Sequence, residues 1–473
     1  MTIQMPDPGD ARSYWLQEAL AGDLGVSCPP LASKVSADVC IVGGGFAGLW
    51  TAIALSEREP NLRIVLLESD ICGGGASGRN GGFVSSSWWD LAGLAGAFGR
   101  EEGLAYAQLV ADQVAWIGEW VRAHDVDCDY REEGILVGEA EEWQRGGHDD
   151  DVETARRFGV PHAIVPYSAE QAREVADSPR WVAGTFVKDC AICQPARLAR
   201  GLRRVAMQRG VHIFEGTSAR AVENGVPAVV RTDGGAVRAD QVVLTHGAWA
   251  ASWPGFRTAF ATIADYVVAT EPMPDRLAEI GWTSMAGIGD SREDFFYLRP
   301  TDDGRIVIGG GDLGFALGGR ADSRAVTHDS KVARSAAEGL LWLFPQLEGV
   351  RFTHAWGGPI DQTAAFLPFF QTRRPGNVHA GLGFSGHGLT QTRIGGEILA
   401  SLVLGADDEW STLPVVGPPL RRVPPEPVRY LGARAVGWGV HGVEKAMEAG
   451  RRPNPVQRGL ASLVGAMRPA PHA

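Results

Sequence analysis

The spacing of apolar and polar residues predicts a chain that alternates between buried strands and amphipathic helices. Apolar positions that recur every three or four residues predict helices at 47–56, 102–124, 194–209, 330–344, 392–404 and near 443–451. Runs that are apolar, or that alternate with polar residues, predict strands at 37–42, 62–67, 211–215, 229–232, 241–245, 266–270, 295–298, 305–308 and 379–383. Residues 1–36 show neither period and are expected to form an irregular arm, and residues 141–151 are expected to form a charged surface loop.

The order of these elements favours two intertwined domains. Strands and helices alternate towards both ends of the chain, whereas the middle is rich in strands. That order predicts a nucleotide-binding α/β domain assembled from separated segments, with a β-rich domain inserted between them. The length of 473 residues also exceeds what one hydrophobic core usually supports.

Three glycines with the spacing of a dinucleotide-binding turn follow the first predicted strand. Gly43, Gly45 and Gly48 fit G-x-G-x-x-G and open the helix that contains Phe46 and Ala47. The first glycine permits a tight turn, the second lets the backbone approach a pyrophosphate, and the third lets the helix pack closely on the strand. The helix N-terminus presents free N–H groups to the phosphates.

An acidic residue stands where a ribose is expected. Glu68 comes twenty residues after Gly48, at the end of the second predicted strand, and Ser69 follows it. A carboxylate there accepts hydrogen bonds from ribose hydroxyls and disfavours a 2′-phosphate, which argues against NADP. The turn and the acid together predict a dinucleotide site, but they do not separate FAD from NAD.

Charge, cysteines and hydropathy limit the partners of this chain. The net charge of −12 argues against nucleic acid as a partner. The C-x-x-C of Cys190 and Cys193 lacks a second pair, so we expect no metal site and interpret it as a strand end, with any redox role left open. The sequence begins without a signal-peptide pattern and has no run of ~18 apolar residues. We therefore expect a cytoplasmic protein without a membrane span; peripheral contact with a membrane stays open.

The loop at 73–82, just after the ribose acid, favours FAD. It reads Gly-Gly-Gly-Ala-Ser-Gly-Arg-Asn-Gly-Gly, and small residues there let backbone N–H groups approach phosphates and a flat ring. Here the chain resembles the D-amino-acid oxidase-like (DAO) family of FAD-dependent oxidoreductases, which typically has G-x-x-A-S-x-R-N-G-G in this place. Further matches at 194–201, 240–249 and 383–390 extend the resemblance over residues 36–405. It is strongest to the branch with γ-glutamylputrescine oxidase, glycine oxidase and sarcosine oxidase.

The resemblance implies a fold and a division of the chain into domains. The fold is α/β (α+β overall), with a discontinuous Rossmann-like FAD-binding domain and an inserted antiparallel-sheet substrate domain. The expected FAD-binding segments are 1–100, 178–258 and 346–415, and the expected substrate-binding segments are 101–177 and 259–345. Residues 416–473 form a C-terminal extension whose role the sequence does not explain.

The resemblance also assigns residues to the cofactor. Besides the glycine turn, Phe46, Ala47, Glu68 and Ser69, these are Gly75, Ala76, Ser77, Arg79, Asn80, Gly81, Gly82, Ala219, Gly247, Trp249, Gly358, Gly386, His387, Gly388, Leu389 and Thr390. The helix after the last loop is expected to aim its positive N-terminus at the flavin N1–C2=O edge, where reduced flavin carries negative charge. We expect non-covalent FAD, because residues 355–363 lack the cysteine, and residues 83–89 the histidine, that attach FAD in some relatives.

The chemistry that the resemblance implies is oxidation of a C–N bond in a small primary or secondary amine or amino acid. A hydride passes from the carbon beside the neutral amine to flavin N5, and the imine hydrolyses to an aldehyde or keto product. Oxygen is the expected acceptor. Some relatives place a lysine over the flavin, but none of the four lysines falls in a segment expected to face the ring: Lys34, Lys188, Lys331 and Lys445. A dehydrogenase, or a flavin module acting on modified tRNA, therefore stays an alternative.

Substrate contacts are expected from the inserted domain. Tyr297 and Arg299 share one face of a predicted strand, and the arginine is a candidate partner for a substrate carboxylate or, alternatively, a surface charge at a strand end. His387 lies between two glycines and is a further catalytic candidate, although a loop role near the flavin is the alternative. Three tryptophans are candidates for the pocket wall, with core packing as the alternative: Trp88, Trp89 and Trp356.

Overall fold

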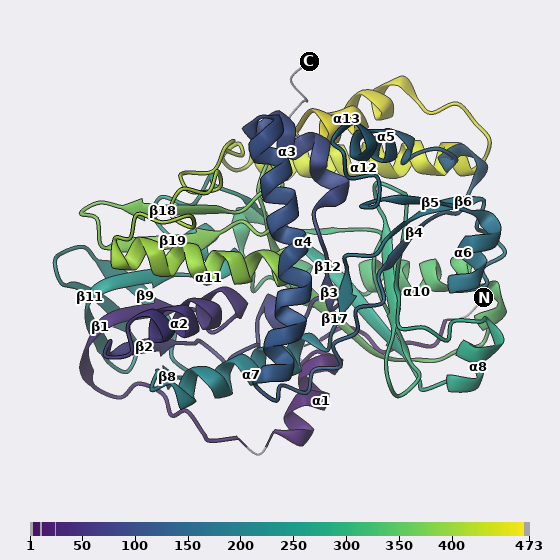
Figure 1. The fold of residues 1–473 in the computed structure, drawn as a ribbon. Helices are drawn as coiled ribbons and strands as arrows, with labels where there is room; N and C mark the ends of the chain where they lie inside the picture. Colours follow the sequence, from purple (N-terminus) through teal and green to yellow (C-terminus); the bar gives the residue numbers. More distant parts are fainter. Residues whose placement is uncertain (1–2, 10–11, 24, 468–473) are drawn as a thin grey trace.

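The computed structural model describes residues 3–9, 12–23 and 25–467, which form two large sheets with helices packed on them (Figure 1). The first sheet, at the left of Figure 1, is parallel through its centre. Its order is β18 (Phe369–Arg373), β19 (Val378–Leu382), β11 (Ala236–Leu244), β1 (Lys34–Val42), β2 (Ile64–Leu67) and β8 (His212–Phe214), and β10 (Ala228–Thr232) and β9 (Ala219–Glu223) continue from β11. The predicted Rossmann-like α/β class is confirmed.

Helices that cover one face of this sheet explain why its central strands are apolar throughout. β2 is buried at all four positions, and β1 is buried at its last four. The covering helices are α2 (Phe46–Arg58), α4 (Arg100–Ala123), α7 (Pro195–Gln208) and α11 (Gly388–Leu404). Gly396 lets α11 lie directly on α2, because a Cβ there would lie 2.6 Å from the Cβ of Trp50.

The second sheet, at the right of Figure 1, is mostly antiparallel. Its order is β16 (Gly314–Phe315), β12 (Ala261–Thr270), β15 (Ile306–Gly310), β14 (Phe296–Pro300), β13 (Gly287–Asp290), β4 (Ile135–Glu139), β6 (Ala183–Val187) and β5 (Val165–Ser168), and β17 (Phe352–Gln362) pairs with β12. The helix α10 (Ser330–Leu343) buries its apolar stripe on one face. On the other face, Val267, Val307 and Trp356 pack with Trp15.

Four predictions of local structure differ from the structure. The arm contains the helix α1 (Tyr14–Gly22), which Ser13 caps at its N-terminus. The predicted loop at 141–151 includes a short 3₁₀ turn and the start of α5 (Asp149–Arg157). The predicted helix near 443–451 is the end of the much longer α12 (Val428–Glu448), and α11 begins at Gly388 rather than at residue 392.

Two strands also fall on the other side of the expected domain boundaries. β6 and β17 belong to the second sheet, although residues 178–258 and 346–415 were expected to belong to the FAD-binding part. Neither strand was among the predicted ones, and the partners that place them in the second sheet are set by contacts distant in the chain. β17 consequently runs from the second sheet directly towards the late loop at 383–390.

The remaining elements connect or cover the sheets. They are α3 (Leu91–Phe98), α6 (Ala169–Val175), α8 (Pro274–Glu279), α9 (Arg324–Thr327), α13 (Pro455–Met467) and the two-stranded pair of β3 (Phe83–Val84) and β7 (Ala191–Ile192). The helices α12 and α13 lie along the top of Figure 1, beside the second sheet. Among the described residues, every helix is too short or too polar to cross a membrane.

Candidate active site

The glycine turn between β1 and α2 is held by close backbone contacts. Gly43 has φ +113°, and a Cβ there would lie 2.8 Å from the carbonyl oxygen of Thr245. A Cβ on Gly48 would lie 1.9 Å from the carbonyl oxygen of Gly43, so only glycine lets the helix approach the strand this closely. Gly45 is the N-cap of α2 and offers no side-chain cap. The first turn of α2 thus keeps backbone N–H groups of the kind that bind a pyrophosphate.

The early loop, residues 73–87, reaches over this helix N-terminus. The N–H of Phe46 donates to Ser77 Oγ at 2.9 Å, and a Cβ on Gly45 would lie 2.9 Å from the same oxygen. Ala47, in the first turn of α2, is buried. The side chain of Ser77 thus links the early loop to the position where the turn can hold phosphates.

Glu68 is fixed by the backbone at the end of β2. One carboxylate oxygen accepts the N–H of Gly44 at 2.8 Å, and the other accepts the N–H of Asp70 at 2.9 Å and the hydroxyl of Ser69 at 3.1 Å. Burial raises the pKa of Glu68, while these donors oppose the rise. The carbonyl oxygen of Glu68 also accepts the N–H of Thr217 at 2.7 Å, which brings the start of β9, at Ala219, towards the same strand end.

Side chains of the early loop are used to shape its own backbone. Arg79 donates to the carbonyl oxygens of Gly74 at 2.9 Å and of Gly357 at 3.0 Å, and burial lowers its pKa. Asn80 donates to the carbonyls of Ala76 and Ser77 and accepts the N–H of Gly82 at 2.8 Å. These bonds make the loop a fixed backbone surface rather than a flexible segment.

The helix α1 supports the early loop from below. The indole N–H of Trp15 donates to the carbonyl oxygen of Asn80 at 2.9 Å, and the hydroxyl of Ser13 donates to that of Gly78. Gln194, at the start of α7, donates in turn to the carbonyl of Trp15 at 2.7 Å. Residues 1–36 were expected to be irregular, so this support was not predicted; the serine cap before an apolar run was the available signal.

The strand β17 joins the early loop to the late loop. Trp356 donates its indole N–H to the carbonyl of Arg79 at 2.8 Å, and a Cβ on Gly358 would lie 3.4 Å from the Cβ of Arg79. Farther along the same strand, Asp361 accepts the N–H of Gly383 at 2.6 Å, and burial raises the pKa of Asp361 to about 6. Segments some 300 residues apart in sequence therefore form one site.

The late loop ends at a second helix N-terminus without a side-chain cap. His387 is the N-cap of α11 and is exposed, and Gly386 before it has φ +85°. Thr390 donates its hydroxyl to the carbonyl of Ser85 at 2.8 Å, which ties α11 to the early loop, and Leu389 beside it is buried. A helix N-terminus that begins with Gly388 can stabilise a developing negative charge.

A cavity of about 480 Å³ adjoins this convergence. Its lining includes Arg79 of the early loop, Trp249 of the 3₁₀ turn after β11, Pro359 of β17, and Arg324 and Thr327 of α9. Trp249 comes two residues after Gly247, which has φ +54°. A Cβ on Gly75 would lie 3.4 Å from the ring of Trp249. The glycine turn with Glu68, the fixed early loop and the N-terminus of α11 fit an elongated dinucleotide cofactor, and this cavity lies beside the early loop at Arg79.

Tyr297 faces the early loop and is paired with a carboxylate that sequence analysis missed. A Cβ on Gly81 would lie 2.5 Å from Cε2 of Tyr297, and the tyrosine hydroxyl donates to Asp265. The other oxygen of Asp265 accepts the N–H of Gly310 at 3.1 Å. Burial raises the pKa of Asp265, and burial together with this carboxylate holds the pKa of Tyr297 well above its usual value. The predicted strand began at residue 266, one position too late to include the acid.

Arg299 is buried, and its guanidinium group donates hydrogen bonds to backbone carbonyl oxygens. Its side chain is 1% exposed, donates to the carbonyls of Cys193 and Pro300, and lies over the ring of Trp15. Burial lowers its pKa to about 10. The alternative of a surface charge is therefore wrong. Its contacts fix the early loop at Gly82, where a Cβ would lie 2.8 Å from Nη1 of Arg299.

The candidate tryptophans occupy different surroundings. Trp88 is buried in the core that the first sheet forms with its covering helices, and its indole N–H donates to Asp189 at 3.1 Å. These surroundings favour core packing over a place in the pocket wall. Trp89 is half-buried, and its indole nitrogen has no hydrogen-bond partner among the described residues. Trp356, as described above, is buried between the early loop and Trp15.

Two further groups lie outside these loops. The ring nitrogens of His246 are buried without a partner in the described structure, and burial lowers its pKa to about 4. Asp294, Asp312 and His441 place ligand atoms within 4.8 Å of one another, so they can hold a metal ion. This group lies where α12 meets the second sheet, away from the glycine loops.

The fold and the loops together define a flavin-type oxidoreductase. The Rossmann-like part offers a dinucleotide site, and β17 of the second sheet contacts both the early loop and the late loop. Comparison with known families agrees with this class. The chain belongs to the DAO family of FAD dependent oxidoreductases, which matches residues 38–402. FAD is therefore its cofactor.

Individual relatives cover most of the chain. It is 29% identical to gamma-glutamylputrescine oxidoreductase of Escherichia coli over 409 residues, which is 85% of this chain and 92% of the relative. It is 23% identical to glycine oxidase of Bacillus licheniformis, over 79% of this chain and 95% of the relative. The crystal structure of glycine oxidase from Geobacillus kaustophilus superposes with a TM-score of 0.66 at 19% identity, over 79% of this chain and 96% of that one, so it shares the fold.

Proposed function

We propose that this chain oxidises the C–N bond of a small amine that reaches the site as a cation. The observation that carries the proposal is the Asp265–Tyr297 pair, in which the ring of Tyr297 lies against Gly81 of the early loop and its hydroxyl donates to Asp265. A buried carboxylate favours a positively charged partner. The names of the relatives, which include a gamma-glutamylputrescine oxidoreductase, support an amine as substrate.

The two arginines that contact the early loop favour an amine over an amino acid. An amino-acid substrate requires a cation free to bind its carboxylate. Arg79 and Arg299 instead donate to backbone carbonyls, so breaking these bonds would leave buried acceptors without donors. The ring of Tyr297 thus lies against Gly81 and its hydroxyl donates to Asp265, whereas the guanidinium groups of Arg79 and Arg299 are already bonded to the backbone. Arg324, which lines the adjoining cavity, is the cation that a substrate carboxylate would bind.

Asp265 can also move the proton that the reaction must release. An ammonium cannot lose hydride from the neighbouring carbon until its nitrogen is neutral, because the nitrogen lone pair must form the new C=N bond. We propose that Asp265, whose pKa burial raises, accepts this proton, while Tyr297 holds the carboxylate in place. FAD, when bound, supplies the two-electron acceptor for the hydride. Water then hydrolyses the imine to an aldehyde or ketone and ammonia or an amine.

The test compares the catalysis of Asp265→Asn, Tyr297→Phe and Asp275→Asn, the last being an exposed acid on α8 that serves as the matched control. Each purified holoenzyme is assayed against polyamine derivatives, primary amines, N-methyl amino acids and glycine. We expect Asp265→Asn to lower kcat/KM for amines at least 100-fold with FAD still bound, consistent with loss of a positioned base. Unchanged amine kinetics in Asp265→Asn, or a clear preference of the native chain for glycine, would refute the amine assignment.

Oxygen is the proposed electron acceptor, as in the relatives named oxidases. The lysines do not lie on the strands that face the early loop: Lys34 is on β1, Lys188 follows β6, Lys331 is on α10 and Lys445 is on α12. A dehydrogenase therefore stays the alternative. Release of one H2O2 for each amine consumed supports the oxidase, whereas turnover only with a dye or quinone supports the dehydrogenase.

FAD is proposed to be held without a covalent bond. The six cysteines are free, and none lies on β17 or in the late loop. Acid precipitation should leave all yellow colour in the supernatant. Flavin that stays with the precipitated chain would show a covalent link.

A further inference from the structure

The family match ends at residue 402. Beyond it, the helices α12 and α13 form a helical hairpin. The helices α12 and α13 pack closely because two glycines of α12 face α13. A Cβ on Gly439 would lie 2.7 Å from the Cβ of Leu460, and one on Gly442 would overlap the side-chain amide of Gln457. The hairpin is attached to the body through buried Arg429 and Glu444 of α12.

Each helix of this hairpin leaves large apolar side chains exposed on one of its faces. On α12, Val428, Leu431 and Trp438 are 60%, 62% and 53% exposed, and their spacing of three and seven residues puts them on one face of the helix. On α13, Val456 and Leu463 are 62% and 46% exposed and lie seven residues apart, again on one face. Exposed apolar groups gathered in this way on two packed helices mark a binding surface.

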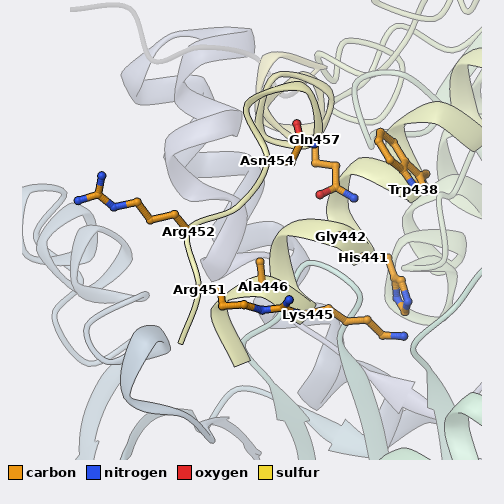
Figure 2. A pocket seen from close by; sticks show the side chains of 9 residues that line it. All are labelled: Trp438, His441, Gly442, Lys445, Ala446, Arg451, Arg452, Asn454 and Gln457. Atoms are coloured by element: carbon orange, nitrogen blue, oxygen red, sulfur yellow. The ribbon is translucent and has the colours of Figure 1, made fainter. Parts of the chain in front are cut away.

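Cations without partners in the described structure lie beside one of these apolar groups, Trp438. A pocket of about 410 Å³ opens between the helices, and its lining includes Trp438, Lys445, Arg451 and Arg452 but no carboxylate. Figure 2 shows Arg451 and Lys445 on the same side of the pocket, whereas Arg452 projects away from it. Throughout the described residues, the side chains of these three cations have no ion pair or hydrogen bond. Lys445 shares the helix face of Leu431 and Trp438.

The charge of this segment opposes that of the rest of the chain. Residues 416–473 contain nine Lys or Arg and three Asp or Glu, a net charge of +6 within a chain of −12, so the rest carries −18. Two copies of the hairpin facing each other would repel. A nucleic acid would leave the exposed apolar side chains without a partner. A bilayer with anionic phospholipids satisfies both features, since it offers negative head groups above an apolar interior.

We propose that the α12–α13 hairpin is a docking element for the surface of a membrane rich in anionic phospholipid. Lys445 and Arg451 bind lipid phosphates, Trp438 lies at the head-group level, and Val428, Leu431, Val456 and Leu463 enter the acyl boundary. The hairpin lies on the surface and does not cross it, because α12 carries charged residues along its length. The proposal is independent of the substrate assigned to the active site.

The test is sedimentation of the full-length holoenzyme with vesicles, followed through flavin absorbance in the pellet. Vesicles of phosphatidylcholine with one third phosphatidylglycerol are compared with vesicles of pure phosphatidylcholine, at low and high NaCl. We expect binding to the anionic vesicles alone, weakened by salt. Binding equal on both kinds of vesicle would overturn the electrostatic part of the proposal, and no binding to either would overturn it entirely.

Three variants separate the contributions to binding. Lys445→Glu/Arg451→Glu should lower partition into anionic vesicles at least tenfold, because two attractive charges become repulsive. Trp438→Ser should lower it several-fold without changing charge. The matched control is Lys34→Glu, an exposed residue on β1 of the other sheet. If the control loses as much binding as the double variant, overall charge rather than the hairpin governs binding, and the proposal fails.

Two other occupants of the surface give distinct results. Glycerol phosphate that binds the holoenzyme at millimolar concentration, without vesicle binding, would indicate a site for a soluble anion instead. A stable dimer by light scattering that Leu431→Ser converts to monomer would indicate a second copy of this chain. Either result contradicts the membrane proposal.

Discussion

The early loop and the α12–α13 hairpin are both rich in glycine, but the hairpin also contains glycines that no contact requires. In the early loop, a Cβ on Gly78 would lie 2.2 Å from the carbonyl oxygen of Gly73, and one on Gly82 would lie 2.2 Å from that of Cys193. In α12, a Cβ on Gly432 would meet nothing within 4 Å. The first set of glycines is required by contact, whereas this helix glycine only lowers helix stability.

The charged groups of the two regions differ in the same way. Arg79 and Arg299 donate to backbone carbonyls and shape the site, so their charges are already used. Lys445 and Arg451 of the hairpin have no partner within the described structure. Residue type alone therefore does not indicate a role. An arginine that is hydrogen-bonded to the backbone shapes a site, whereas one without such bonds is available to a partner.

The largest expected loss of bound FAD comes from paired glycine substitutions in the two regions. Gly48→Ala puts a Cβ 1.9 Å from the Gly43 carbonyl oxygen, so we expect a loss of about 3 kcal/mol of unfolding free energy and of bound FAD. Gly432→Ala should stabilise the protein by about 0.5–1 kcal/mol. Urea unfolding and the ratio of flavin to protein absorbance measure both. Equal effects of the two substitutions would show that close contact does not distinguish Gly48 from Gly432.

A second pair compares two tryptophans. Trp15→Ala removes a side chain that is 1% exposed and donates to the early loop, and we expect it to cost about 3–5 kcal/mol and to weaken FAD binding. Trp438→Ala removes an exposed ring and should change stability by less than about 0.5 kcal/mol. Thermal unfolding with and without added FAD separates the two effects. A Trp15→Ala variant with native FAD affinity would show that α1 does not support the loop.

The smallest effect concerns pH at the base of the hairpin. Burial, together with the charge of Glu444, raises the pKa of Asp294 to about 8, and burial raises that of Glu444 to about 7. Both groups take up protons on folding, so their contribution to stability is present at low pH and is lost as the pH rises through 7 and 8. We expect α12 to exchange its amide hydrogens faster at pH 9 than at pH 6, after correction for the intrinsic rate.

The control for this pH effect is Glu444→Gln, which removes one of the two titrating groups. It should flatten the pH dependence of exchange in α12 and leave exchange in α2 unchanged. Unaltered pH dependence in the variant would show that the two carboxylates do not govern docking of the hairpin.

The cofactor half was predictable from sequence because its signals are local. The turn at Gly43–Gly48 and the acid at Glu68 lie within thirty residues, and each residue type follows from a contact within that unit. The late loop at 383–390 was predictable only through resemblance to a family. The alternation of strands and helices likewise gave the fold class, since buried parallel strands are apolar throughout.

Contacts distant in the chain explain what sequence analysis missed. β6 and β17 were not predicted as strands and were expected in the FAD-binding part; their partners β4 and β12 place them in the second sheet. Asp265 interrupts an apolar strand, and its importance depends on Tyr297, thirty-two residues later. A pattern along the chain predicts which residues are buried but not which ones meet.

The path of β17 has a consequence for how the enzyme is made. The early loop at 73–87 is completed by Gly357 and Trp356 of that strand and by Thr390. A ribosome that adds about 5–20 residues per second needs on the order of 15–60 s to extend the chain from the early loop to residue 390. The glycine turn thus emerges long before the rest of its site. We expect nascent chains stalled before residue 350 to retain no flavin, so that loading of the cofactor follows synthesis rather than accompanying it.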